Sequence, residues 1–514
     1  MTEFADVPET LEHKIPEHPN TRTPAEGMTE FADDPQTAVE QTLSRLREAT
    51  RNSPYEGRIY VVGGLLRDRA LGVPPGNDLD LVLEGDAVEL ALNLYKQGVA
   101  MHYPVSYPRF GTAMIHVGKP GQNCKAGQND NETESAAAVE LVSARCESYH
   151  ADSRKPRVWR GSLQDDVLRR DFTINTLLEN LHTGEMLDLT GRAETDLRAG
   201  IIRTPVDPRD TFYDDPLRML RAVRFAARFG FEIESATWEA MCAEAERLRP
   251  PAVARERIRE EFIKIIKLPG ANIRCGMELL LQAKLIDQFL PEMLPMVGCA
   301  QGPWHRYDVW THTLFALEQL PDRTGDAMRL ALLWHDVGKP NTRTEDERGV
   351  HFYGHPAAGA EIARAMMQRL KFSNDDIRDV STLVAKHMRL GEYRPYWGDA
   401  PVKRLIRDCG PYIDDLFVLA RCDAAAAAIP PDEAVDLNAL RARIDAINSV
   451  SNAAAIESPL DGNEIMEALH VGPGTHLRDG KEFLTNEVIE GRLMPGDQDA
   501  ARDMVRAWWR QRQG

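Results

Sequence analysis

The segment VVGGLLRDRALGVPPGNDLDLVLEGD, residues 61 to 86, constrains the fold more than any other part of the chain. It predicts a buried strand, a turn at Gly63 and Gly64, a short helix, and a second strand that opens with Asp78 and Asp80. Two residues apart on a strand, these carboxylates project from one face and can hold Mg²⁺. The two glycines admit phosphate oxygens to the backbone, and Arg67 can neutralise them. A DxD pair alone would indicate only a solvated sheet edge, but its combination with the Gly-Gly turn favours a phosphoryl-transfer site.

The surrounding pattern predicts an α+β chain. Strand-like runs cover residues 58–64, 78–85, 110–118 and 137–149, with a helix between them at 86–98 and another before them at 37–50. Residues 119–135 are rich in Gly, Asn and Gln and predict a long solvated hairpin loop. After Pro205 helical periodicity dominates. We therefore expect a small mixed β-sheet head with helices on one face, followed by an all-α remainder.

The bulk properties of the chain set its class. Its 514 residues exceed one compact core, and no apolar run reaches the roughly 18 residues of a membrane span. MTEFADVPET at the start is nearly repeated as MTEFADDPQT from Met28, and residues 1 to about 35 are predicted to be disordered. The acidic N-terminus is not a secretory or transit sequence, so we expect a cytoplasmic protein. Seven single cysteines without a CxxC pair argue against disulfides and a zinc ribbon.

The net charge of −18 is unfavourable for RNA binding, which uses lysine and arginine. Its distribution is uneven. Residues 1–50 hold 11 acids against 4 basic residues, whereas residues 151–260 hold 20 acids against 19 basic residues. We therefore expect RNA contacts in the middle of the chain.

The segment FYDDPLRMLRAVRFAARFGF, residues 212–231, predicts a helix with Asp214 as its cap and Pro216 in its first turn. Its charged residues recur every three positions along one face: Asp215, Arg218, Arg221 and Arg224. One interpretation is a surface ladder of ion pairs. The other is a recognition face, because a carboxylate paired with a guanidinium can hydrogen-bond the Watson-Crick edge of a base.

A second cluster of chemistry lies downstream in helical context. Its members are His312, His335, Asp336, His355, His387 and Asp423. Imidazole and carboxylate together suit divalent transition ions, and helices can bring distant residues into one shell. The alternative is that the cluster binds no metal and only supports the fold.

The head motifs resemble the nucleotidyltransferase head of the DNA polymerase beta superfamily. Three stretches narrow the resemblance to bacterial CCA-adding enzymes and poly(A) polymerases: VELVSARCESY at 139–149, LRRDFTINTL at 168–177, and the 212–231 helix with RERIREEFIKII at 255–266 behind it. Thr176 and Asp214 depart from the family, where Ala and Glu are usual.

The resemblance implies a role for each matching residue. Glu140 is the third carboxylate, and Arg145, Glu147 and Tyr149 lie in the site. Arg170 binds the triphosphate, and Asp215 with Arg218 selects the base. The nucleotide-binding set implied in full is Gly63, Gly64, Arg67, Asp68, Arg145, Arg170, Asp171, Asn175, Asp215, Arg218, Arg221 and Arg224. The implied reaction is a two-metal in-line displacement in which a tRNA 3′-hydroxyl attacks the α-phosphate of CTP or ATP and pyrophosphate leaves.

The downstream cluster resembles the HD phosphohydrolase superfamily, whose pattern of H, HD and D falls on His312, His335, Asp336 and Asp423. His355 and His387 match the additional ligands of its two-metal members. The resemblance implies a bound divalent ion (Ni, Mn, Co, Fe or Mg) and a phosphatase or 2′,3′-cyclic phosphodiesterase activity.

Together these expectations divide the chain into five parts. They are an acidic extension with a short helix (1–50), a nucleotidyltransferase head (51–204), a nucleotide-selecting neck (205–268), an HD-type body (269–430) and a tRNA-facing tail (431–514). Rival functions are a partial CC- or A-adding enzyme, a poly(A) polymerase, a metal-dependent phosphohydrolase with a nucleotide-binding head, and a purely RNA-binding protein. Oligomeric state is not indicated by the sequence.

Overall fold

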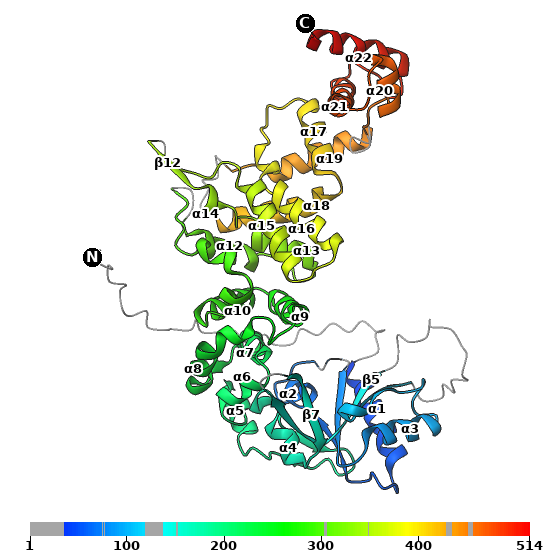
Figure 1. Cartoon of the computed structure of the whole chain (residues 1–514), viewed down its shortest axis with the longest axis vertical. Helices are drawn as coiled ribbons and strands as arrows, with labels where there is room; N and C mark the ends of the chain where they lie inside the picture. The colour runs from blue at the N-terminus through cyan, green and yellow to red at the C-terminus, as the bar shows by residue number, and fades with distance from the viewer. Residues whose placement is uncertain are drawn as a thin grey trace, which may run out of the picture.

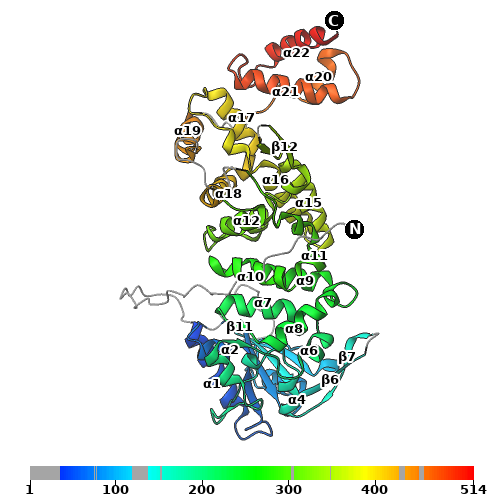
Figure 2. The same ribbon diagram turned by 90° about the vertical axis from the view of Figure 1, so that its left-hand side faces the viewer.

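The computed structural model describes residues 35–74, 76, 78–118, 137–150, 153–302, 306–347, 349–427, 434–450 and 456–513. The expected disorder before residue 35 and the expected loop at 119–135 lie outside these ranges. The molecule is elongated, and its parts follow one another along the long axis in chain order, from the blue and cyan head to the red tail (Figures 1 and 2). The described helices include none long and apolar enough to cross a membrane.

A seven-stranded sheet forms the head, with strand order β3-β4-β5-β2-β1-β8-β9. β2 and β5 are parallel, whereas the other pairs are antiparallel, so the expected mixed sheet is confirmed. The strands are β1 (Ile59–Val62), β2 (Asp78–Leu83), β3 (Val105–Tyr107), β4 (Thr112–Val117), β5 (Ala137–Ser143), β8 (Leu178–Asn180) and β9 (Met186–Leu187). A separate hairpin of β6 (Arg145–His150) and β7 (Ser153–Arg160) follows β5 directly.

One face of this sheet is buried. Its leucines and valines pack against α1 (Pro35–Thr50), α2 (Gly64–Ala70) and α3 (Ala87–Lys96), as the strand alternation predicts. The opposite face carries a smaller cluster in which Leu163 and Val167 of α4 (Leu163–Leu168) cover Val62 and Val82. Asp80, Glu140 and Met114, on that same face, keep part of their surface exposed. The head is therefore open on one side of its sheet.

The neck is joined to the head by a short parallel pairing. β10 (Ile201–Ile202) pairs with β11 (Glu232–Ile233), and Arg203 links the two parts because it bonds Asp196 at 3.2 Å and Glu234 at 2.8 Å. α5 (Ala193–Ala199) is the last helix of the head, and the neck helices are α6 (Pro208–Asp214), α7 (Leu217–Phe229), α8 (Ser235–Glu244) and α9 (Arg255–Ile266).

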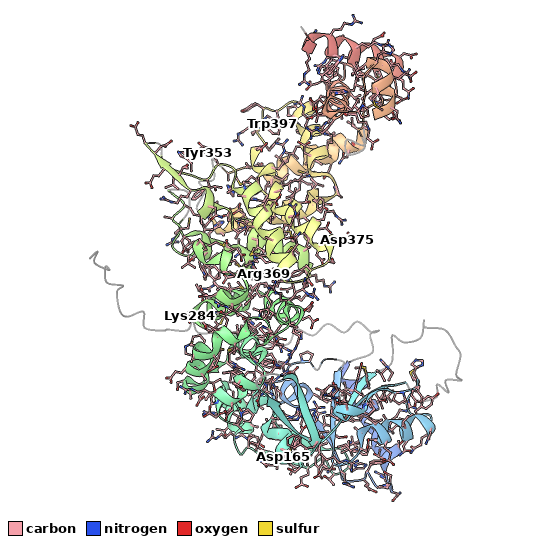
Figure 3. The ribbon with its side chains drawn as sticks, in the orientation of Figure 1. Asp165, Lys284, Tyr353, Arg369, Asp375 and Trp397 are labelled. Atoms are coloured by element: carbon pink, nitrogen blue, oxygen red, sulfur yellow. The ribbon has the colours of Figure 1, made fainter. Side chains whose placement is uncertain are left out.

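The body is helical, with one hairpin. Its helices are α10 (Ala271–Gln282), α11 (Ile286–Phe289), α12 (Val309–Glu318), α13 (Asp326–Trp334), α14 (Lys339–Thr342), α15 (His355–Arg369), α16 (Asn374–Lys386), α17 (Asp399–Cys409) and α18 (Ile413–Ala426). α19 (Leu437–Val450) falls in the range expected for the tail but packs on the large core that includes the body. Arg369, at the end of α15, lies where the body meets the neck (Figure 3) and accepts a hydrogen bond from Arg255 of α9 at its carbonyl. The tail helices α20 (Gly462–Leu469), α21 (Thr475–Ile489) and α22 (Gln498–Gln513) have a core of their own.

Two short pairings differ from the all-α expectation after Pro205. They are β11 in the neck and the hairpin of β12 (Thr344–Asp346) and β13 (Gly349–His351) in the body. Each strand spans only two or three residues, which is too short for a period-two pattern to stand out in the sequence. The mixed α+β class is unchanged by them.

Candidate active site and a second metal centre

The first candidate site lies where β1 ends beside β2. Gly63 has a φ of 76°, a left-handed conformation that favours glycine. A Cβ at this position would lie 3.2 Å from Asp80 Oδ2 and 3.8 Å from Arg170 Nη1. A side chain at this position would crowd Asp80, so glycine lets the carboxylate and the Arg170 guanidinium lie close to the backbone of the turn.

Glu140 stands directly opposite Asp80, because the two residues are Cα partners on the parallel strands β5 and β2. Both are half-buried and lie on the open face of the sheet. Carboxylate oxygens are the ligands that Mg²⁺ prefers. Asp78 begins β2 at the position two residues before Asp80, but its side chain, like those of Glu147 and Tyr149, lies outside the described part of the chain.

Arg170 reaches this turn from the end of α4. Its Nη2 donates to Asp166 Oδ2 at 2.9 Å, and Asp166 also pairs with Arg169. Burial raises the pKa of the Asp166 carboxyl, but the two arginines outweigh burial and hold this pKa below its usual range. Asp166 is thus a fixed anion that orients Arg170, and it was missed in the sequence because an acid in a first helical turn is common.

Asp171, Asn175 and Arg221 form one buried network. Arg221 donates to Asp171 Oδ2 from Nε at 2.8 Å and from Nη2 at 2.6 Å, and Asn175 donates to Asp171 Oδ1 at 2.9 Å. Burial raises the pKa of Asp171, but the charge of Arg221 dominates and lowers it. The network joins residues 168–177 to α7. Asp171 and Asn175 therefore hold these two segments together beside the site.

Arg67 is buried beside the Gly-Gly turn. It is 5% exposed, donates to Asp68 Oδ1 at 2.8 Å and to Asn175 Oδ1 at 2.7 Å, and lies 4.9 Å from the rings of Phe225 and Phe229. A Cβ at Gly64 would lie 3.3 Å from Arg67 Nη2, so the buried guanidinium lies beside the Gly-Gly turn, and its role toward the triphosphate stays a prediction. Asp68 belongs to the same internal pairing. Gly64 lies beside it as the first residue of α2.

The base-selecting segment contains a break. α6 ends at Asp214 and α7 begins at Leu217, and the carboxylate of Asp215 accepts a hydrogen bond from the Leu217 amide at 3.2 Å. Pro216, and not the predicted Asp214, is the N-cap residue of α7, and the side-chain bond to the first amide of this helix comes from Asp215, the C-cap residue of α6. Asp215 also pairs with Arg257 of α9 at 2.9 Å, whereas Arg218 donates to the carbonyl of Arg169 at 2.6 Å.

The remaining arginine of the predicted stripe is internal. Arg224 donates to the buried carboxylate of Glu261 on α9. Arg257 and Glu261 both belong to the RERIREEFIKII segment, which packs against α7. The surface-ladder interpretation is therefore wrong for Arg221 and Arg224, which bind buried acids. Their pairing with residues 37 to 50 positions away was not visible in the local pattern.

All six members of the downstream cluster meet inside the body. Asp336 is central: its Oδ2 lies 3.2 Å from His335 Nε2 and 3.9 Å from His312 Nε2, while its Oδ1 lies 3.4 Å from His355 Nε2 and 3.8 Å from His387 Nε2. Asp423 Oδ1 lies 2.7 Å from His312 Nε2. Two ligand triads therefore share one carboxylate, His312 with His335 and Asp336, and Asp336 with His355 and His387.

The imidazoles are oriented for coordination. Nδ1 of His335, His355 and His387 lies 2.7 to 2.8 Å from the carbonyl of the residue three positions earlier. Such a bond fixes the tautomer that leaves the Nε2 lone pair for a metal. Four histidines and two carboxylates fit a divalent transition ion, and a carboxylate shared by two triads fits a two-ion centre.

Two histidines of the centre have pKa values shifted in opposite directions. Burial lowers the pKa of His335, but Asp336 and Asp423 outweigh burial and raise that pKa to about 10. Burial and the His335 charge lower the pKa of His387 to about 4. Lys339, which the sequence did not single out, lies 2.7 Å from Asp336 Oδ2 and donates to Gln301 at 2.6 Å. It neutralises part of the carboxylate charge.

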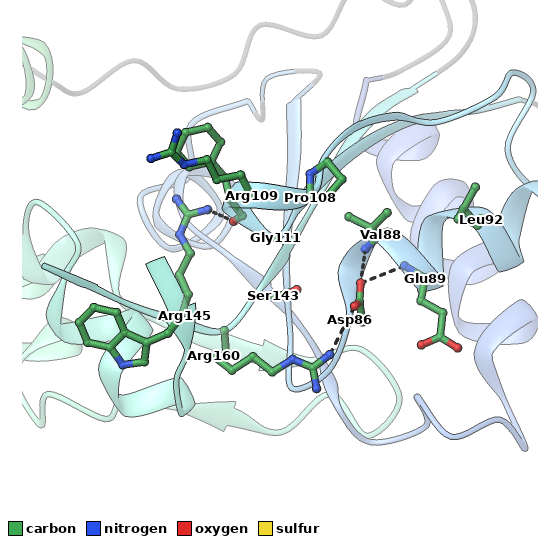
Figure 4. A pocket seen from close by; sticks show the side chains of 13 residues that line it. Asp86, Val88, Glu89, Leu92, Pro108, Arg109, Gly111, Ser143, Arg145 and Arg160 are labelled. Carbon is green, nitrogen blue, oxygen red and sulfur yellow. Dashed lines mark hydrogen bonds and ion pairs between the residues drawn. The ribbon is translucent and has the colours of Figure 1, made fainter. Parts of the chain in front are cut away.

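Arg145 lies away from Asp80, at the far end of β5. It donates to the carbonyl of Phe110 and to Thr112 Oγ1 at 3.1 Å. There it lines a pocket together with Arg109, Trp159 and Arg160, beside the start of α3 (Figure 4).

Models of three families match consecutive parts of the chain. They are the poly A polymerase head domain at residues 59–203, the probable RNA and SrmB-binding site of polymerase A at 230–296, and the HD domain at 305–428.

Curated relatives extend this match. The CC-adding tRNA nucleotidyltransferase of Thermus thermophilus is 35% identical over 359 residues, covering 68% of this chain and 78% of the relative. The A-adding tRNA nucleotidyltransferase of Deinococcus radiodurans is 31% identical, covering 68% and 80%. A multifunctional CCA protein of Laribacter hongkongensis is 32% identical, covering 71% and 84%.

Solved structures share the fold. The Bacillus stearothermophilus CCA-adding enzyme in complex with CTP superposes with a TM-score of 0.61 at 19% identity, covering 93% of this chain and 98% of that one. The sheet, the Gly-Gly turn and the histidine-rich body thus define a head-plus-HD nucleotidyltransferase. The chain belongs to the family of tRNA nucleotidyltransferases and poly(A) polymerases, and the expected resemblance is confirmed.

Proposed function

We propose that this protein completes the 3′ end of tRNA by adding C, C and A from CTP and ATP without a nucleic-acid template, and that it does so in the cytoplasm. The observation that carries the proposal is the pairing of Asp80 with Glu140 beside the open turn at Gly63. Relatives of comparable similarity are named as CC-adding, A-adding and multifunctional enzymes. The number of nucleotides added is therefore the finer point to be tested.

The carboxylates of Asp78, Asp80 and Glu140 would hold Mg²⁺, which when bound stabilises the charge that develops on the phosphates and lowers the pKa of the attacking hydroxyl. The chain's own residues do the rest. Arg170, oriented by Asp166, lies where it can bind triphosphate oxygens. Gly63, which has no side chain, would let those oxygens approach the backbone amides of the turn.

Base selection follows from the break between α6 and α7. Asp215 and Arg218 project from its two sides, and Arg257 holds Asp215 from α9. A carboxylate accepts from an amino group of cytosine or adenine, and a guanidinium donates to ring nitrogens or carbonyls. The fixed network of Asp171, Asn175 and Arg221 holds this selecting face against the catalytic strand.

One assay tests the proposal. Purified protein is supplied with Mg²⁺, a tRNA that ends before the triplet, and labelled CTP alone, ATP alone, or both. We expect two C residues with CTP alone and the full triplet with both. A stop after CC with both nucleotides would indicate a CC-adding enzyme, and a long ladder with ATP alone would indicate a poly(A) polymerase. No extension under any condition would refute the proposal and favour the hydrolase.

We further propose that the body is a metal-dependent phosphohydrolase acting on phosphate monoesters or 2′,3′-cyclic phosphates at RNA ends. It is favoured by the two ligand triads that share Asp336. Their imidazole and carboxylate donors fit Ni, Mn, Co or Fe, and Mg less well. Hydrolysis of a 2′,3′-cyclic nucleotide, measured with each metal in turn, tests this activity. The absence of turnover with every metal would leave the centre a structural one.

A further inference from the structure

The open face of the head sheet carries a strip of exposed apolar side chains beside the catalytic carboxylates. Strand register places Val105, Met114, Glu140 and Asp80 in one row across β3, β4, β5 and β2. Val105 is 53% exposed and Met114 is 40% exposed. In the next row Tyr107 of β3, 54% exposed, stands opposite Thr112. Residues opposite one another in register project from the same face, so the strip and the carboxylates share one surface.

The alternation along β4 shows that this exposure is specific to one face. Ala113, Ile115 and Val117 are fully buried toward α3, whereas Met114 between them faces outward. Large apolar side chains exposed together on a strand mark an interaction surface, because water contact with them is unfavourable. Adjacent strands are about 4.8 Å apart and each residue rises about 3.3 Å, so Tyr107, two strands and two residues away, stands roughly 12 Å from Glu140. That distance is within reach of the terminal nucleotides of a bound strand.

Positive charge borders the strip at its Tyr107 end. Arg145 donates to Thr112 Oγ1, the residue opposite Tyr107, and so lies over the same face. Arg109 and Arg160 line the adjoining pocket with Trp159, which is 50% exposed (Figure 4). Two acids, Asp86 and Glu89, also line this pocket, and Arg160 pairs with Asp86 at 3.3 Å. Arg109 and Arg145 therefore supply the cationic border.

We propose that Tyr107 and Met114 form a stacking platform for the 3′-terminal bases of the RNA that is being extended. The terminal base lies on Met114 with its 3′-hydroxyl toward Glu140 and Asp80, and the preceding base lies on Tyr107 with its phosphate toward Arg145. Aromatic faces bordered by arginines bind single-stranded RNA regardless of base, which suits an end that changes with every addition. The inference rests on the proposed nucleotide addition and names the positioning residues for its RNA substrate.

The test separates RNA binding from nucleotide binding. KM for tRNA and KM for CTP are measured for Tyr107→Ala, Met114→Ala and the double variant, with Tyr107→Phe and Met114→Leu as conservative partners. Stacking on one aromatic side chain changes affinity by roughly fivefold or more. We expect KM for tRNA to rise at least about fivefold in Tyr107→Ala and further in the double variant. KM for CTP should stay within about twofold, and the conservative variants should resemble wild type.

Met186 supplies a matched control, because it is 44% exposed on β9 at the opposite edge of the same sheet. Met186→Ala should leave both constants unchanged. An unchanged KM for tRNA in the double variant overturns the platform, as does an equal rise in Tyr107→Phe or Met186→Ala. A rise in KM for CTP alone also overturns it. A wild-type protein that extends no tRNA refutes the proposed function instead, so the two failures are distinguishable.

Discussion

The two candidate metal centres of this chain are built in opposite ways. In the head, Asp80 and Glu140 project from adjacent strands onto a half-exposed sheet face, and the ligands are oxygen atoms. In the body, His335, Asp336 and His387 are at most 3% exposed, and three imidazoles are fixed by backbone carbonyls. One centre is open and rich in carboxylate, and the other is enclosed and rich in imidazole.

This difference indicates how each ion is used. Mg²⁺ retains water and arrives with the phosphates of its nucleotide, so a site that serves it must open at every cycle. Transition ions bind imidazole tightly, and a buried shell oriented in advance holds them through many cycles. We therefore expect the head ion to exchange with substrate and the body ion to copurify with the protein.

The largest expected effect tests the independence of the two centres. Asp80→Ala should reduce nucleotide addition by roughly a thousandfold, because metal stabilisation of the transition state is worth several kcal/mol and each tenfold is about 1.4 kcal/mol. Hydrolysis of a cyclic nucleotide and the melting temperature should stay at wild-type values. Incorporation by Asp80→Ala at the wild-type rate would show that Asp80 is not needed for nucleotide addition.

The reciprocal change is His335→Ala. We expect the metal that copurifies with the protein to fall below detection by elemental analysis and cyclic-nucleotide hydrolysis to fall at least about a hundredfold, because a ligand to the centre is lost. Addition of C and A should remain within about twofold. Hydrolysis that persists in this variant would assign that activity to another part of the chain.

A smaller effect concerns the buried pairing that supports the head. Arg221→Ala leaves the carboxylate of Asp171 buried without its main partner, and should lower the free energy of unfolding by about 2 kcal/mol, since Arg221 is itself one-third exposed. Arg198→Ala, which removes an exposed pair with Glu194, is the matched control and should change stability by less than about 0.5 kcal/mol. Equal effects in chemical denaturation would contradict the network.

The smallest effect is a pH dependence. The folded-state pKa of Asp171 is lowered, so its contribution to stability is complete at neutral pH and is lost as pH falls through and below its unfolded pKa of about 3.9. Between pH 6 and pH 3 the stability difference between wild type and Asp171→Asn should therefore shrink. A difference that stays constant over this range would show that Asp171 is not held as an anion.

Features that depend on residues close together in the chain could be predicted from the sequence. Gly63, Gly64 and the DxD pair specify a turn and two strand positions locally, and their place in the sheet follows from strand pairing. The ligand histidines were recognisable because each occurs in a short motif on its own helix. The structure brings these motifs together around Asp336 as expected.

What could not be predicted depends on partners distant in the chain. The local pattern around Arg67 does not indicate its partners, because Asn175, Phe225 and Phe229 come from distant segments that the fold brings against α2. The sequence predicts one helix that includes Asp215, because a proline such as Pro216 occurs both in the first turn of a helix and between two helices. The pairing of Asp215 with Arg257 required knowledge of where α9 lies.

The bridge that Arg203 makes between Asp196 and Glu234 has a mechanical consequence. Together with the parallel pairing of β10 and β11, this bridge holds the head and the neck together at two points of the short segment 201–203. Such a doubly anchored joint resists hinge rotation. We therefore expect the angle between head and neck to stay the same when a nucleotide binds.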